Sequence, residues 1–206
     1  MADLPLRRLM DSIASGDEEA ALALLEGSPA LATAALEEGA TRGAAPDNFL
    51  EPIRHYVYAG DTALHVAAAA HRPGLARALL DRGADVRATN RRGATALHYA
   101  ADGSPPRSAG DAERQAATLA LLIASGADPD AQDRDGVAPL HRAVRCRCAA
   151  AVEALLKGGA DATRANANGS TPAKLASHPT GRSGSGSGAA KAQQAEIVRI
   201  LEAHGA

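Results

Sequence analysis

The sequence predicts an all-α solenoid, in which helix-turn-helix units stack side by side and hairpins project from the stack. The main observation is a period. The tripeptide Gly-Ala-Asp begins at Gly83, Gly126 and Gly159, and the last two copies are 33 residues apart. A second glycine follows ten residues after each of these, at Gly93, Gly136 and Gly169. Such a fixed period indicates repeated supersecondary units that bury their apolar faces against one another.

The first helix of each unit has a recognisable start. A threonine hydroxyl can accept a hydrogen bond from a free amide of the first helical turn. Threonines occupy this position in three units, at Thr62, Thr95 and Thr171. Pro139 and Pro172 fall at the first helical position, where a missing N–H has no partner to lose.

The second helix of each unit ends in a regular way. A leucine recurs four residues before each closing glycine, on the expected apolar stripe, at Leu79, Leu122, Leu155 and Leu201. Gly83, Gly126 and Gly159 suit a left-handed helix terminus. About ten residues then lead to the next glycine, which is too few for another helix pair and fits a projecting hairpin.

Both ends of the chain are expected to close the stack. Leu6 to Ser15 and Asp17 to Glu26 predict a helix pair in which Asp17 is the N-cap. Ala189 to His204 predicts an amphipathic final helix. We expect the stack to end there, at a natural terminus.

Four units carry the same spaced residues, and the clearest copy reads Gly60-Asp61-Thr62-Ala63-Leu64-His65-Val66-Ala67-Ala68. It resembles the ankyrin repeat, whose signature is Thr-Pro-Leu-His followed by Ala, with Gly-Ala closing the second helix. The resemblance is close over residues 60–206 and loose before them. It implies an ankyrin-repeat solenoid, a non-catalytic module that binds a partner protein through its hairpin tips and concave face. It also implies that His65, His98 and His141 tie hairpin to helix by hydrogen bonds.

We therefore expect one domain over residues 1–206. Its parts are a degenerate N-terminal cap repeat at 1–36, an enlarged finger insertion at 37–59, and repeats at 60–89, 90–132, 133–165 and 166–206, the last of which is a C-terminal cap.

Composition narrows the functional classes. The net charge is −2, aromatic residues make up 2% of the chain, and tryptophan is absent, so neither a general attraction to nucleic acid nor a large globular core is expected. No apolar run is long enough to span a membrane. Cys146 and Cys148 are expected within one helix, pointing about 200° apart, as small residues of a reducing cytoplasm. Abundant Ala, Arg and Gly suggest a bacterial source.

Three insertions interrupt the period. Ser104 to Ala112 and Pro179 to Gly188 predict solvated loops, and the second lacks the Gly-Lys-Ser/Thr ending of a phosphate-binding loop. The third, between Leu36 and Gly60, holds three of the four aromatic residues. One interpretation is that Phe49, Ile53 and Tyr56 fold back onto the first two units. The other is a finger that presents Tyr58 and Tyr56 to a partner, since tyrosine is a favoured interface anchor.

The resemblance selects a candidate binding face on the hairpin tips and first helices. Its partner-binding residues are expected to be Tyr56, Tyr58, Asp61, Arg91, Arg92, Arg134, Asp135, Arg142 and Arg145. The five arginines of this set could form a basic strip that faces an acidic protein surface, because a planar guanidinium can donate a pair of hydrogen bonds to a carboxylate. The alternative is that they are solvated charges paired with Asp133 or Asp135.

Other functions are less well supported by the sequence. The recurrent histidines belong to successive units, too far apart to share one metal ion, so neither a metal nor a cofactor is expected. No Ser/His/Asp, His-Glu-x-x-His or dinucleotide-binding motif points to an enzyme. Nucleic-acid binding through the arginine strip is the remaining alternative, against which the acidic remainder and the scarce aromatics argue. We expect a monomer with a protein partner.

Overall fold

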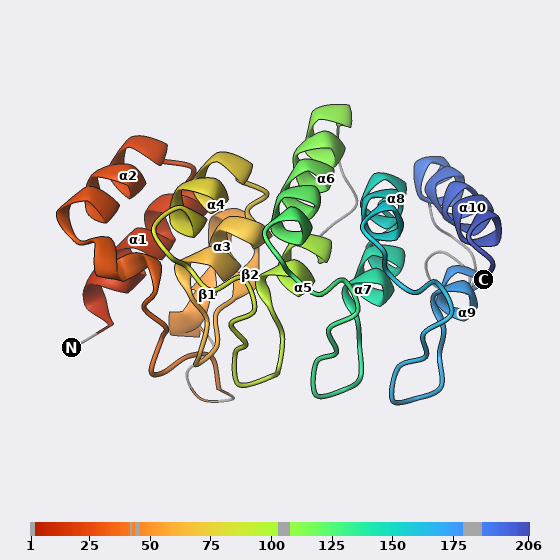
Figure 1. Cartoon of the computed structure of the whole chain (residues 1–206), viewed down its shortest axis with the longest axis horizontal. Coiled ribbons are helices and arrows are strands. Elements are labelled where there is room, and N and C mark those ends of the chain that lie inside the picture. The colour runs from red at the N-terminus through yellow and green to blue at the C-terminus, as the bar shows by residue number, and fades with distance from the viewer. Residues whose placement is uncertain (1–2, 42, 44–45, 103–107, 179–186) are drawn as a thin grey trace.

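A computed structural model describes residues 3–41, 43, 46–102, 108–178 and 187–206. Helix pairs stand side by side in chain order, and the hairpins between pairs all project from the same side of the stack (Figure 1). The predicted all-α repeat solenoid is therefore confirmed.

The helices form two rows. The first helices of the pairs are α1 Leu4–Ser15, α3 Ala63–Ala69, α5 Ala96–Ala101, α7 Pro139–Cys146 and α9 Pro172–Ala176. The second helices are α2 Glu18–Gly27, α4 Pro73–Leu80, α6 Ala109–Ala124, α8 Ala149–Lys157 and α10 Gly188–Ala203. Each helix packs on its neighbours in its own row and on its partner in the pair. A helix of the stack therefore buries most of its apolar surface against adjacent units.

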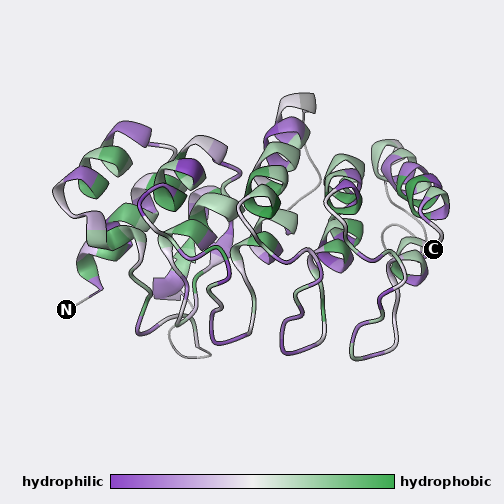
Figure 2. Cartoon of the chain, in the orientation of Figure 1, coloured by the Kyte–Doolittle hydropathy of each residue, from purple (hydrophilic) through white to green (hydrophobic). Residues whose placement is uncertain are grey.

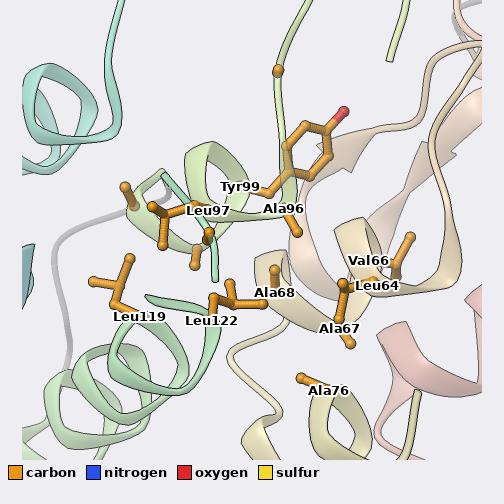
Figure 3. Packing of buried hydrophobic residues seen from close by; sticks show 14 of the residues in the cluster. Leu64, Val66, Ala67, Ala68, Ala76, Ala96, Leu97, Tyr99, Leu119 and Leu122 are labelled. Atoms are coloured by element: carbon orange, nitrogen blue, oxygen red, sulfur yellow. The ribbon is translucent and has the colours of Figure 1, made fainter. Parts of the chain in front are cut away.

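Alanine and leucine fill the space between the rows. Leu79, Leu122 and Leu155 are fully buried on the second helices, as their spacing predicts. Figure 2 shows the hydrophobic residues on the helix faces that meet, whereas the hairpins are largely hydrophilic. Figure 3 shows Ala68 between Leu64 and Leu122, where a small side chain lets neighbouring helices approach closely. This packing explains how the chain can build a core with few aromatic residues.

The helix starts and stops follow the sequence expectations. Thr62 and Thr95 are N-caps of α3 and α5, and the Thr171 hydroxyl accepts a hydrogen bond from the Lys174 amide at 3.2 Å. Asp17 caps α2 through the Ala20 amide at 3.0 Å. Pro139 and Pro172 open α7 and α9. The closing glycines have the positive φ of a left-handed terminus, at Gly83, Gly126 and Gly159.

The repeated histidines join each unit to the next hairpin. Nδ1 of His98 accepts a hydrogen bond from the Thr95 amide at 3.1 Å, so its proton resides on Nε2, 2.9 Å from the Val137 carbonyl. His65 and His141 make the equivalent contacts, with Ala94 at 3.2 Å and Ser170 at 3.0 Å. The tie between hairpin and helix that the resemblance implies is thus present in three units.

Three sequence expectations are corrected. Cys146 ends α7 and Cys148 precedes α8, with Arg147 between them at a φ of 55°, so the two cysteines do not share a helix. The expected loop at 104–112 is partly helical, because Ser108 caps α6 and the helix begins at Ala109. The expected loop at 179–188 likewise ends in a helix start, because Ser187 caps α10 and the helix begins at Gly188. The remaining parts of the two predicted loops, 104–107 and 179–186, lie outside the described residues.

The segment between α2 and α3, which includes the insertion, contains short elements of its own. They are the 3-10 turns η1 Pro29–Ala32, η2 Pro46–Asn48 and η3 Glu51–Ile53, and an antiparallel pair of strands, β1 Phe49–Leu50 and β2 His55–Tyr56. Ile53 is partly buried against the core, and the Phe49 ring packs against Tyr56 at a tilt of 49°, with ring centroids 4.6 Å apart. Tyr56 remains 41% exposed. The segment therefore covers the flank of the stack with Ile53 and leaves Tyr56 accessible.

Candidate functional site

A groove of about 580 Å³ opens between the insertion and the third and fourth helix pairs. The insertion contributes one wall, through Arg54, His55, Tyr56 and Tyr58. The opposite wall is the exposed side of α7 and the residues after it, and the hairpin tips around Arg92 and Asp135 border the groove. Figure 1 shows why these segments meet: β2 lies beside α5, and α7 is the next helix along the row.

A buried polar network forms the base of this groove. The Tyr99 hydroxyl donates a hydrogen bond to the Asp61 carboxylate at 2.7 Å, and Asn90 Nδ2 donates to the same carboxylate at 2.9 Å. The Tyr58 amide supplies a third bond, at 2.7 Å. Three donors compensate the burial of this carboxylate. The network therefore holds the start of α3, the following hairpin and α5 in fixed register.

Asp61 is a correction to the predicted binding face. It was expected on an exposed hairpin, but its side chain is fully buried and cannot touch a partner. The reason is that its hydrogen-bond partners Asn90 and Tyr99 come from the next unit, so stacking covers the carboxylate. Burial and the adjacent carboxylate also raise the pKa of Tyr99 well above its ordinary value, so the phenol stays a donor.

The α7 wall carries a second ionic cluster. Arg142 lies between Asp133 at 2.8 Å and Asp102 at 3.2 Å, and only 14% of its side chain is exposed. Burial alone would raise the pKa of Asp133, but hydrogen bonds from Arg142 and from the backbone amides of Val137 and Asp135 outweigh it and lower that pKa. Arg142 therefore mainly holds the hairpin to α7. Its pairing with Asp133 agrees with the alternative interpretation of the arginines given above.

The hairpin tips bring together the other predicted arginines. Adjacent hairpins are joined by a backbone hydrogen bond from the Arg134 amide to the Arg92 carbonyl, at 2.9 Å. The guanidinium carbons of Arg91 and Arg92 lie 5.4 and 5.5 Å from the Tyr58 ring centroid, within cation–π range. Arg91 also donates to the Ala40 carbonyl, and Arg92 pairs with Asp135 at 3.6 Å. The tips thus form a rigid, mixed-charge rim with a tyrosine in it.

Arg145 is exposed on α7 and lines the groove, as expected for a partner-binding residue. Sequence reasoning missed several other lining residues, among them Arg54, His55, Asn90, Tyr99 and Arg147. The His55 ring packs edge-on against Tyr99 with centroids 4.3 Å apart. Burial lowers its pKa, although Asp102 and Asp61 oppose this. The periodic pattern could not point to Arg54 or His55, because both lie in the insertion.

Among the residues that the structure describes, no three His, Cys, Asp or Glu side chains gather where they could hold a metal ion. Within the same residues, no helix has the length and apolar character needed to cross a membrane.

The hairpins and first helices of the stacked helix pairs line a groove. This arrangement is that of a repeat protein that presents a preformed surface. A family model of ankyrin repeats in many copies matches residues 49–100 and 122–176, more than half of the chain. The model of a single ankyrin repeat matches residues 92–134. The chain therefore belongs to the ankyrin repeat family, whose members are typically non-catalytic modules for protein–protein interaction. No curated protein matches it.

Proposed function

We propose that this protein acts by binding one partner protein in the groove between the insertion and α7, without chemistry of its own. The observation that carries the proposal is the groove of about 580 Å³, which is bordered by most of the predicted binding residues. The partner is expected to be an enzyme that this chain inhibits, scaffolds or protects. Cytoplasmic location and a monomeric state remain parts of this proposal.

The rigidity of the groove supports a binding role. Its floor is fixed by the three hydrogen bonds to Asp61, and its α7 wall is fixed by the ion pairs of Arg142. A preformed surface loses little conformational entropy on association, so contacts made there translate efficiently into affinity. Tyr58, which is partly exposed and lies beside Arg91 and Arg92, is well placed to be an interface anchor.

Nucleic-acid binding is less well supported by the groove. Three aspartates, Asp102, Asp133 and Asp135, line it together with the arginines. A phosphate backbone carries closely spaced negative charges and would meet these carboxylates. A protein surface can instead offer both signs of charge in the required places.

Site-specific photo-crosslinking tests the proposal. A benzoylphenylalanine replaces Tyr58 in the groove or, as the matched control, the exposed Ala117 on the far side of α6. In cells of the source organism, we expect one protein to be captured from position 58 and not from position 117. Changing Arg91, Arg92 and Arg134 to Glu should abolish that capture.

A second control separates local from overall charge. The control variant changes three exposed arginines away from the groove to Glu, namely Arg8, Arg77 and Arg199. This triple variant should leave capture unchanged. Equal capture from both crosslinking positions, or loss of capture with both triple variants, would count against the groove as the binding surface.

A further inference from the structure

The charges in the groove do not balance. Among the residues that the structure describes, five arginines and three aspartates line it, which leaves a surplus of two positive charges. All three aspartates are paired inside the groove, two of them with Arg142 and the third with Arg92. Arg54 and Arg145 also line the groove and belong to none of these ion pairs, so both contribute to the surplus.

Arg54 and Arg145 face the groove from opposite walls. Arg54 follows η3 at the turn of the insertion hairpin, and Arg145 lies on α7. Both are exposed, and no ion pair is found for either within the described residues. Two guanidinium groups on facing walls of a concave, partly screened site raise the local concentration of anions.

Two aromatic residues come directly after Arg54 in the chain. His55 and Tyr56 follow it in β2 and line the groove. The His55 ring packs against Tyr99, and the Tyr56 ring packs at a tilt against Phe49. These contacts fix two flat rings next to the cationic group. A ligand that combines negative charge with an apolar side chain would satisfy both parts of the wall.

We propose that the groove takes an extended acidic segment of a partner protein, in which two nearby carboxylates pair with Arg54 and Arg145 and an apolar side chain between them lies on His55 and Tyr56. This inference rests on the proposed function, because it names the ligand of the same groove. A guanidinium can donate two parallel hydrogen bonds to one carboxylate. The cavity of about 580 Å³ is within the usual range of sites that enclose a small ligand, and it therefore admits a few side chains.

An NMR titration with a defined peptide tests this ligand chemistry. The probe is the capped pentapeptide acetyl-Ala-Glu-Leu-Glu-Ala-amide, and its control has Gln in place of both Glu residues. We expect the Glu peptide to shift backbone amides at 54–58 and 142–147 in a saturable way, while the Gln peptide leaves them unchanged. Affinity should fall about tenfold between low salt and physiological salt, because the contacts are ionic and partly exposed.

Matched variants locate the two carboxylate contacts. Arg54→Ala and Arg145→Ala should each weaken the Glu peptide by about twofold to fivefold, the range expected for an exposed ion pair. Arg8→Ala removes the same charge from the exposed surface of α1 and should have no effect. Amide spectra of all three variants should match the parent outside the changed site, which shows that each one folds.

Three results would overturn the inference. Equal shifts with the Gln peptide would show that binding does not require carboxylates. Shifts confined to other surfaces would show that the peptide does not bind in the groove. Stronger shifts of the same amides by a thymidine decanucleotide would assign the surplus charge to nucleic acid. Each of these can occur while the crosslink from position 58 persists, so the ligand assignment can fail separately from the proposed function.

Discussion

The Tyr99 hydroxyl donates a 2.7 Å hydrogen bond to the carboxylate of Asp61, which lies 38 positions earlier in the chain. Tyr99 belongs to α5 and Asp61 directly precedes the N-cap of α3. In Figure 3 the Tyr99 hydroxyl points away from the aliphatic cluster that surrounds the base of the ring. One side chain thus contributes to the apolar core and to the polar floor of the groove, so stacking and site geometry depend on each other.

Replacing Tyr99 by Phe should destabilise the protein. The aromatic ring can still pack, but the buried Asp61 carboxylate loses one of its three donors. We expect the free energy of unfolding in urea to fall by about 1–3 kcal/mol, the cost of an unsatisfied buried polar group.

Tyr56→Phe is the control for this measurement. That side chain is 41% exposed, and the same loss of a hydroxyl should change the unfolding free energy by less than about 0.5 kcal/mol. If the two variants lost equal unfolding free energy, the Tyr99–Asp61 hydrogen bond would not stabilise the protein more than an exposed hydroxyl does.

Gly39→Ala should disturb the insertion where it meets the hairpin before α3. A Cβ at Gly39 would lie 2.4 Å from the Tyr58 carbonyl carbon, and this backbone atom cannot rotate away as a side chain can. We expect a loss of about 1–3 kcal/mol in unfolding free energy, typical of overpacking, together with faster amide exchange at Tyr58.

Gly43→Ala is the matched control within the same insertion. A Cβ at Gly43 meets nothing within 4 Å. Stability and amide exchange at Tyr58 should therefore stay at the parent values. A similar loss of unfolding free energy in both variants would mean that the insertion tolerates no side chain at either position. The close contact at Gly39 would then not be the specific cause.

The sequence predicted the repeated parts of the fold well, for a physical reason. Caps, closing glycines and buried leucines are local requirements of each helix, and they recur because every unit packs in the same way. Thr62, Pro139 and Gly126 could therefore be assigned from spacing alone.

The misjudged positions depend on contacts across units or on unusual backbone. Asp61 was expected on the surface, because nothing local shows that Asn90 and Tyr99 would cover it. The turn between α7 and α8 places Arg147 at a φ of 55°, a conformation that arginine seldom adopts, so a continuous helix was expected there. Arg54 and His55 lie outside the period and had no repeat equivalent to compare.

Arg142→Ala should leave Asp133 without its main partner. Only 6% of the Asp133 side chain is exposed, so removing the guanidinium at 2.8 Å leaves a poorly solvated carboxylate. The amides of Asp135 and Val137 still donate to it at 3.0 Å. We therefore expect a loss of about 2–3 kcal/mol in unfolding free energy, at the low end for a broken buried pair.

The pKa of Asp133 provides an independent readout of this change. Without Arg142, burial should dominate and the pKa should rise, which a carboxyl-carbon NMR titration measures. Arg145→Ala, on the exposed side of the same helix, should alter neither the stability nor the pKa of Asp133. An unchanged Asp133 pKa in Arg142→Ala would contradict the pairing.

The stability of the stack should fall as the pH is lowered from 7 to 4, because of the repeated histidines. Burial lowers the pKa of His98 from 6.5 to about 4, helped by the nearby charge of Arg142. Its Nδ1 accepts the Thr95 amide and its Nε2–H donates to the Val137 carbonyl, so an added proton on Nδ1 would face a donor. Folding therefore favours the neutral ring.

The sign follows from linkage: between these two pKa values the unfolded chain binds the proton and the folded chain does not. The contribution of His98 is complete above pH 6.5 and is lost as the pH falls through about 4. From pH 7 to pH 5 it should amount to about 2 kcal/mol. In urea unfolding, the free energy of unfolding of His98→Gln should decrease less between pH 7 and pH 5 than that of the parent, and the difference should be that amount. The control is His204→Gln, at the exposed C-terminal end, whose decrease should match that of the parent. If His98→Gln is too unstable to compare, a histidine ring titration of the parent decides the point, and a His98 midpoint near 6.5 would refute the buried, neutral assignment.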